Sequence, residues 1–252
     1  MNCNHSLDKV YVNRMGIFFI DIEYTNGNFY LGEVFEIACL SEGSGYAFHS
    51  YVKISDNIPR YIQKLCNITT SIIYNSPSWC SVIQGVIEFI KAEEDTSPTI
   101  IVGHGGNLFD FPLLIAQCLK CGYDYMQLNS FLFCDSMEIL QSMDYHKPGL
   151  DAMSNTNRKT HSAIQDVYLL RNVVRKYIPY NDLTRHSQTL ERILQYMESK
   201  MPLSITELYK IAHHTESILA LETTLSTYKN EKTALKEKQI RKIANKYFNA
   251  TR

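Results

Sequence analysis

The stretch Gly16-Ile-Phe-Phe-Ile-Asp-Ile-Glu-Tyr-Thr25 joins an apolar run to two carboxylates. Asp21 and Glu23 follow the uncharged residues 16–20 and flank Ile22. Alternate residues of a strand point to the same side, so both carboxylates are expected on one face of a buried strand. Neighbouring acids repel each other unless a cation, such as a hard divalent metal ion, neutralises them. The pair could instead end the strand in solvent, and further acids in the chain distinguish the two interpretations.

Residues 15–54 predict three strands in succession. The expected strands cover residues 15–23, 33–40 and 46–54. Asn26-Gly27-Asn28 and residues 43–45 supply short turns between them. Strands joined by such turns pair antiparallel, so this part of the chain is expected to form a meander.

Strands and helices alternate after residue 54. The expected elements are a helix over residues 79–90, a strand at 99–103, a helix at 112–121, a strand at 131–134 and a short helix at 136–142. Pro112 and Gly122 mark the two ends of the second helix. Strands that alternate with helices usually join a sheet in parallel. The predicted fold is therefore α/β, with a mixed sheet of antiparallel meander and parallel strands flanked by helices.

Length and composition suit one large domain with a smaller appendage. The 252 residues are 45% hydrophobic, which is ample for a sizeable core. We expect a flexible lead-in at residues 1–14, a main domain at 15–180 and a helical extension at 181–252. Helices are expected in the extension at residues 187–200, 204–228 and 231–248. The extension packs either on the main domain or on a second copy, so a homodimer through these helices or through a sheet edge is an open alternative.

Charge is balanced overall but not along the chain. The formal net charge is −1 and the pI about 6.7, so composition gives no overall signal for nucleic acid. Residues 229–252 carry eight cations and two acids, a local net charge of +6. Such a helix either follows a phosphate backbone or presents a solvated face.

The sequence predicts a soluble intracellular protein, cytoplasmic or nuclear. No run of about 18 apolar residues occurs, and the N-terminus has no signal-peptide pattern, so no membrane association is expected. Seven scattered cysteines do not form a disulfide framework and suit a reducing compartment. Cys118 and Cys121 form a lone C-x-x-C without the second pair that a structural zinc site needs.

Two later segments supply further acids at strand and helix ends. Asp110 follows the strand expected at 99–103 and precedes the next helix, where it could bind a ligand or cap the helix. Ser162 and Gln165 form a capping-box pattern, which predicts a helix from Ser162 with His161 on the preceding loop. Asp166 then lies in the first turn, where a carboxylate also interacts favourably with the helix dipole.

Four acids in the order Asp, Glu, Asp, Asp, with a histidine five residues before the last, resemble the DEDDh exonucleases of the ribonuclease H-like fold. The three motifs are Phe19-Ile-Asp-Ile-Glu23, the segment around Asp110, and His161-x-Ala163-x-x-Asp166, all in family order. The resemblance covers about residues 15–177. The family that these motifs resemble includes the proofreading subunits of DNA polymerases.

Within that group the likeness is strongest to the three-prime repair exonucleases. Residues 103–114 read Gly-His-Gly-Gly-Asn-Leu-Phe-Asp-Phe-Pro-Leu-Leu and are similar to that branch's second motif. Residues 133–137 and 65–69 resemble two further family segments. Gly105 replaces the family's usual asparagine, and Asn26 displaces a glycine of the first motif. Residues 181–252 match no family pattern.

The resemblance implies two-metal-ion hydrolysis with Mg²⁺, for which Mn²⁺ can substitute. The residues at catalytic positions are Asp21, Glu23, Asp110, His161 and Asp166. In this family Asp21, Glu23 and Asp166 would hold the first ion, Asp21 and Asp110 the second, and His161 would act as general base. The residues expected to bind the substrate are Glu23, Tyr24, Thr25, His104, Phe109 and His161.

The activity that the resemblance implies is a 3′→5′ exonuclease that releases nucleoside monophosphates from DNA, single-stranded or at duplex 3′ ends. The alternatives are an RNA-trimming enzyme of the same family, an endonuclease or polynucleotidyl transferase of the same broad fold, and a non-catalytic nucleic-acid-binding protein that retains the fold. A binding protein has no need for four converging acids, which favours an enzyme.

Overall fold

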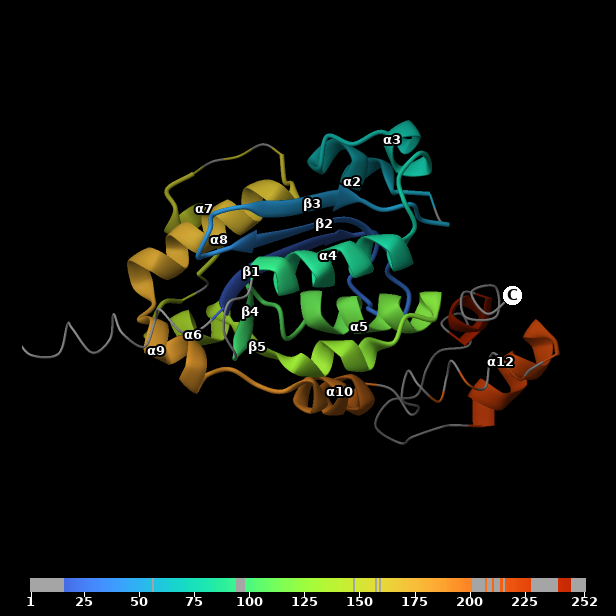
Figure 1. Cartoon of the computed structure of the whole chain (residues 1–252). Coiled ribbons are helices and arrows are strands. Elements are labelled where there is room, and N and C mark those ends of the chain that lie inside the picture. The colour runs from blue at the N-terminus through green and yellow to red at the C-terminus, as the bar shows by residue number, and fades with distance from the viewer. Residues whose placement is uncertain are drawn as a thin grey trace, which may run out of the picture.

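A computed structural model describes the chain over residues 16–55, 57–93, 98–146, 148–156, 158, 160–200, 207, 210, 214, 216–227 and 240–245. Its centre is a five-stranded sheet in the order β3-β2-β1-β4-β5 (Figure 1). The strands are β1 (Gly16–Tyr24), β2 (Val34–Ser41), β3 (Ala47–Tyr51), β4 (Thr99–Gly103) and β5 (Phe131–Asp135). β1 to β3 pair antiparallel, while β4 and β5 join in parallel. The predicted mixed sheet is confirmed.

The middle strand β1 runs further than its parallel neighbour. Its pairing with β4 begins at Gly16 opposite Thr99 and ends at Phe19 opposite Val102. Its pairing with β2 continues through Asp21 and Glu23, and Glu23 lies opposite Glu36. The two acids of β1 therefore lie beyond the last pair with β4, at the carboxyl edge of the parallel strands where sites on α/β sheets form.

Helices cover both faces of the sheet. α4 (Trp79–Glu93) and α5 (Asp110–Cys121) share one hydrophobic core with Phe18 and Ile20 of β1. α8 (Ala163–Tyr177) packs with Ile17 and Phe19 in a second core on the other face (Figure 1). Side chains alternate along a strand, so Asp21 and Glu23 fall on the α8 face with Ile17 and Phe19.

Shorter helices connect or extend this frame. They are α2 (Arg60–Leu65), α3 (Thr70–Tyr74), the 3₁₀ helix η1 (Tyr125–Ser130), α6 (Ser136–Ser142), α7 (Leu150–Met153), α9 (Tyr180–Arg185), α10 (Leu190–Ser199) and α12 (Ile218–Thr227). α7 lies in the segment that precedes His161. α5 begins two residues before the expected start, and Gly122 ends it in the left-handed conformation at φ 75°.

The C-terminal part packs on the core beneath α5. Leu190, Ile193 and Met197 of α10 are buried in the same core as α4 and α5, and the Tyr30 hydroxyl donates to the Met197 carbonyl at 2.8 Å. Residues 240–245 are helical and contribute Ile240 and Ile243 to that core. α12 lies within the helix expected at 204–228. The helix expected at 231–248 and the basic tail lie largely outside the described residues, and the lead-in at 1–14 lies wholly outside them.

Cys80 and Cys121 form a disulfide that the sequence interpretation did not expect. The two residues lie at neighbouring ends of α4 and α5, which pack together, so the pairing depends on tertiary structure and leaves no local pattern. The free cysteines among the described residues are Cys39, Cys66, Cys118 and Cys134, all of them buried. None of the helices within the described residues is long and apolar enough to span a bilayer.

Candidate active site

One pocket of about 350 Å³ collects every residue that the sequence singled out for catalysis or substrate binding. These residues are Asp21, Glu23, Tyr24, Thr25, His104, Phe109, Asp110, His161 and Asp166. They come from the end of β1, the loop between β4 and α5, and the start of α8. Segments up to about 140 residues apart in the sequence thus meet at one edge of the sheet.

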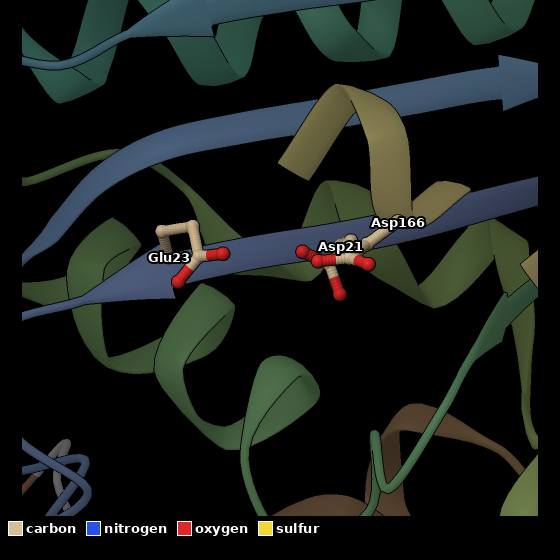
Figure 2. Close-up of side chains that lie close together, drawn as sticks. All are labelled: Asp21, Glu23 and Asp166. Atoms are coloured by element: carbon tan, nitrogen blue, oxygen red, sulfur yellow. The ribbon is translucent and has the colours of Figure 1, made fainter. Parts of the chain in front are cut away.

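Three carboxylates converge at the base of the pocket. Asp21 and Glu23 extend from the same side of β1, and Asp166 reaches toward Asp21 from the first turn of α8 (Figure 2). One oxygen from each of the three lies within 4.8 Å of the other two. This all-oxygen donor set is the type that Mg²⁺ and Mn²⁺ prefer.

The electrostatics of the three acids favour a bound cation. Burial, followed by repulsion from Asp110 and Asp166, raises the pKa of Asp21 well above its ordinary value. Burial and the charge of Asp166 raise the pKa of Glu23 to about 7. Acids that resist ionisation in this way are stabilised as carboxylates when a metal ion supplies the missing positive charge. The residues present therefore fit a divalent cation.

Asp110 is the first residue of α5 and lies beside the three-acid group. It is 6% exposed, and burial together with the charge of Asp135 raises its pKa to about 8. Phe109, not Asp110, occupies the N-cap position of α5. Helix capping therefore does not account for this acid.

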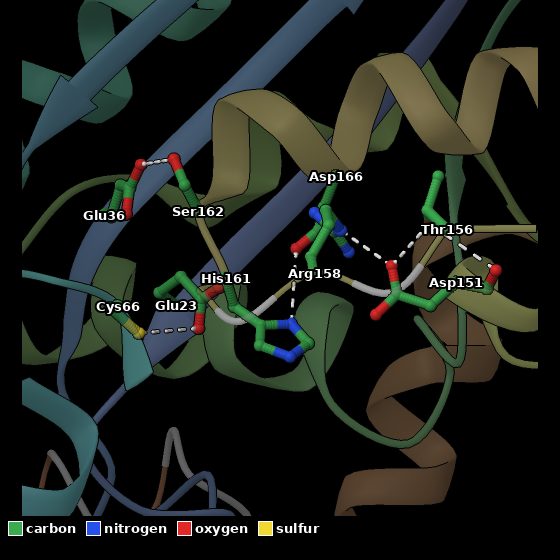
Figure 3. Close-up of polar contacts among 9 residues, drawn as sticks. All are labelled: Glu23, Glu36, Cys66, Asp151, Thr156, Arg158, His161, Ser162 and Asp166. Atoms are coloured by element: carbon green, nitrogen blue, oxygen red, sulfur yellow. Dashed lines mark hydrogen bonds and ion pairs between the residues drawn. The ribbon is translucent and has the colours of Figure 1, made fainter. Parts of the chain in front are cut away.

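His161 lies on the loop before α8, as expected, and is tied to the sheet by its neighbours. Its backbone N–H donates to the Leu65 carbonyl at 2.9 Å, and its Nδ1 is 3.9 Å from Oδ2 of Asp166 (Figure 3). Ser162 occupies the N-cap position, but among the described residues its hydroxyl makes no capping bond. It donates instead to Oε1 of Glu36 at 2.8 Å, so the expected capping box is wrong in its bonding.

Asp135 holds the loop that carries Asp110. Its carboxylate accepts from the backbone N–H groups of Gly105 at 2.8 Å, Asn107 at 3.1 Å and Met137 at 2.9 Å. Gly105 has φ 75°, a left-handed conformation that glycine adopts without strain. The sequence matched the segment around Asp135 to the family but gave it no role, because the bonds from Gly105 and Asn107 join residues about 30 positions apart.

The pocket walls are aromatic and apolar. The rings of Tyr24 and Phe109 are stacked, with centroids 6.1 Å apart and planes at 13°. Phe109 is 38% exposed, whereas Phe111 is fully buried in the core. Tyr61 and Leu65 of α2 also line the pocket and are exposed, although the sequence did not predict them as pocket residues.

Two charged residues near the acids escaped the sequence analysis. Glu36 of β2 is 1% exposed and accepts hydrogen bonds from His49 and Ser162. Arg158 forms ion pairs with both Asp151 and Asp166 (Figure 3). For Glu36, the one indication in the sequence was a charged residue within the otherwise apolar β2. For Arg158, the polar loop that contains it gave no indication.

A larger groove of about 830 Å³ adjoins the pocket and shares Thr25 and Asn26 with it. Lys53, Lys120 and Lys242 line this groove, whereas Glu33 is the acid among its described lining residues. Lys242 comes from the helical residues 240–245, so the C-terminal part of the chain contributes to a surface next to the acids.

Solved exonuclease structures share this fold. Two structures of E. coli Exonuclease I, one with zinc and single-stranded DNA and one with a dT13 oligonucleotide, give TM-scores of 0.54 and 0.55 at 15% identity. They match 74% and 73% of this chain, which spans 43% and 44% of theirs. A 3′-exonuclease that recognises the 3′ end of a histone mRNA stem-loop gives 0.54 at 16% identity, over 65% of this chain and 63% of its own.

The sequence itself carries the family relationship. Among curated proteins, none matches the chain. A family model described as Exonuclease, of the RNase T type, matches residues 18–174, from the first acid motif into α8. This match covers more than half of the 252 residues. The chain therefore belongs to the RNase T exonuclease family.

Proposed function

We propose that the protein is a metal-dependent 3′→5′ exonuclease that releases nucleoside monophosphates from DNA 3′ ends. The observation that carries the proposal is the convergence of Asp21, Glu23 and Asp166 in one pocket that also contains His161 and Asp110. The similarity of residues 103–114 to the three-prime repair exonucleases favours that branch and a DNA substrate. An exoribonuclease is the second candidate, because one structural neighbour recognises the 3′ end of an RNA.

The four acids would hold two Mg²⁺ or Mn²⁺ ions. Asp21, Glu23 and Asp166 suit the first, and Asp110 with Asp21 the second. Such ions, when bound, supply a nucleophilic water at neutral pH and neutralise the charge that develops on the phosphate. Burial of Asp110 limits the access of water to its carboxylate and strengthens its attraction for a cation.

His161 is placed to remove the proton from the attacking water. A neutral imidazole nitrogen can accept a proton from a water molecule within hydrogen-bond reach. The Asp166 oxygen 3.9 Å from Nδ1 stabilises the imidazolium that forms. The bonds from the His161 backbone to Leu65 and from Ser162 to Glu36 hold the base over the pocket.

The walls and the adjoining groove suit the two parts of a nucleic-acid strand. The exposed ring of Phe109, stacked on Tyr24, offers a face to the terminal base without regard to its identity. Beyond Thr25 and Asn26, the exposed Lys53 and Lys242 of the larger groove offer positive charge to the phosphates that precede the terminal nucleotide.

Digestion of 5′-labelled oligonucleotides tests the proposal. DNA and RNA, single- and double-stranded, are incubated with the protein and Mg²⁺ or Mn²⁺, beside the Asp21→Ala variant. We expect a ladder that shortens from the 3′ end, loss of activity in Asp21→Ala, and no cutting of circular DNA. Full activity in Asp21→Ala contradicts the mechanism, a preference for RNA moves the substrate to the second candidate, and cutting of circles indicates an endonuclease.

A further inference from the structure

Arg158 joins the two ends of the loop that carries His161. Its Nε lies 2.6 Å from Oδ1 of Asp151 in α7, and its Nη2 lies 2.6 Å from Oδ1 of Asp166 in α8 (Figure 3). The Thr156 hydroxyl donates to the same Asp151 oxygen at 2.9 Å. The Arg158 side chain is only 17% exposed. Its guanidinium is therefore fixed between two acids and is not a freely solvated surface charge.

The guanidinium touches one of the three converging carboxylates. Oδ1 of Asp166 faces Arg158, while Oδ2 faces Nδ1 of His161. Arginine keeps its charge at every working pH, so this is a permanent cation beside the acids. Its effect also reaches β1: burial and repulsion from Asp166 raise the pKa of Glu23, and the charge of Arg158 opposes that rise.

We propose that Arg158 is the resident counter-ion of the three-acid group and that it lowers the affinity of this group for divalent cations. The proposal rests on the metal-dependent function given above. Arg158 acts through Asp166 as a positioning residue: it offsets repulsion among the acids when no ion is bound and repels an ion that shares Asp166. Tight ion binding is then expected when the negatively charged substrate end also occupies the pocket.

Calorimetric titration with Mn²⁺, at fixed pH and salt and without substrate, tests the proposal. Arg158→Met removes the charge and keeps an unbranched apolar stem. Removing a unit charge next to a doubly charged ion is expected to tighten Mn²⁺ binding about tenfold. Arg158→Lys retains the charge, so its Mn²⁺ affinity should stay within about threefold of that of the wild type. Arg158→Gln also removes the charge and should tighten Mn²⁺ binding, and it replaces Arg158→Met in the titration if Arg158→Met folds poorly.

Arg171→Met is the matched control. Arg171 also lies on the α8 side of the sheet, is 17% exposed and pairs through Nε with Oε2 of Glu42 at 2.7 Å, but Glu42 is not one of the three converging acids. Both Arg→Met variants lose a partly buried ion pair and should melt at lower temperature in a chelator. Only Arg158→Met is expected to change Mn²⁺ affinity.

Unchanged or weaker Mn²⁺ binding in folded Arg158→Met and Arg158→Gln overturns the counter-ion role. An equal rise in affinity in Arg171→Met also overturns it, because the effect would then not depend on contact with Asp166. Wild-type protein that binds no Mn²⁺ contradicts the metal-dependent function itself. If Mn²⁺ binding is lost without Asp21 but its affinity does not change without Arg158, the metal-dependent function stands and only the counter-ion role of Arg158 is contradicted.

Discussion

The Ser162 hydroxyl donates a 2.8 Å hydrogen bond to Oε1 of Glu36, which lies 126 positions earlier in the chain. The same oxygen accepts from Nε2 of His49 at 2.8 Å. Glu36 lies on β2 directly opposite Glu23 of β1. Because Ser162 follows His161, this bond fixes the end of the histidine loop to the strand that neighbours the acids.

Glu36→Ala is expected to reduce kcat about tenfold and the free energy of unfolding by about 2 kcal/mol. The substitution leaves two donors, on His49 and Ser162, without their shared buried acceptor. It also loosens the backbone next to His161, and a misplaced base slows the reaction. Kinetics at saturating Mn²⁺ and denaturant unfolding measure the two effects. Wild-type kcat in Glu36→Ala would show that the bond to Ser162 does not position His161.

Glu36→Gln is the matched variant, since it keeps a side-chain oxygen as acceptor and removes the charge. Glu36 helps to raise the pKa of Glu23, so its neutralisation should lower that pKa. The acid limb of the pH–rate profile is then expected to move to lower pH, while stability changes less than in Glu36→Ala. An unchanged acid limb argues against coupling between the two glutamates.

The metal-free protein is expected to lose stability as pH rises from about 5.5 to 8.5. Glu23 and Asp110 have folded-state pKa values raised to about 7 and about 8, whereas the unfolded chain ionises them near pH 4. Between these values the folded state holds protons that the unfolded state has released, so stability falls as pH increases. Melting temperatures in a chelator measure this slope.

Metal ions should reverse that slope. Mg²⁺ or Mn²⁺ binds the ionised acids, so the rise in melting temperature on adding metal should be larger at pH 8.5 than at pH 5.5. Glu23→Gln and Asp110→Asn remove groups that titrate and should flatten the chelator curve. A melting temperature that changes neither with pH nor on addition of metal contradicts the electrostatic account of these acids.

Patterns local in sequence predicted most of the frame and much of the pocket. The apolar run before Asp21 marked the central strand, and Pro112 and Gly122 bracketed α5 because each residue restricts its own backbone. The features that the sequence did not predict depend on contacts between segments that lie far apart along the chain. Arg158 meets Asp166 through the folding of a polar loop, and Cys80 meets Cys121 through the packing of two helices.

Ser162 shows how a correct local pattern can give the wrong bond. The capping-box pattern placed the start of α8 within one residue, because a serine before a helical repeat marks an N-terminus. A buried carboxylate on β2 then competes for the hydroxyl, and a charged acceptor forms the stronger hydrogen bond.

Gly105→Ala is expected to destabilise the protein by about 1 to 2 kcal/mol. The backbone at φ 75° is strained for any residue with a Cβ, and that atom would lie 2.6 Å from Cε of Met137. Because the Gly105 N–H donates to Asp135, the strain is transmitted to the loop that carries Asp110. Denaturant unfolding measures the loss.

Gly149→Ala is the control for that substitution. Gly149 has φ −65°, and no described atom lies within 4 Å of an added Cβ. Its replacement should be neutral or slightly stabilising. Equal losses at the two glycines would remove the special role assigned to the backbone of Gly105.

Charge reversal in the adjoining groove is expected to weaken substrate binding without slowing the chemistry. Lys53→Glu combined with Lys242→Glu should raise KM for a long single strand several-fold, leave kcat near wild type and reduce the salt dependence of KM. Lys176→Glu, at the far end of α8, should change none of these values. A KM that stays constant in the double variant contradicts a strand path through this groove.

His161→Ala is expected to lower kcat by about 10² to 10⁴ while leaving Mn²⁺ affinity nearly unchanged. The imidazole is 3.9 Å from Asp166 and lies outside the three-acid group, so its loss removes the proposed base and keeps the proposed ion ligands. His186→Ala, at the end of α9, is the matched control and should match wild type in both measurements. Single-turnover digestion and Mn²⁺ titration separate the two effects. If kcat and Mn²⁺ affinity fall together in His161→Ala, the histidine supports the metal site and is not the base that activates water.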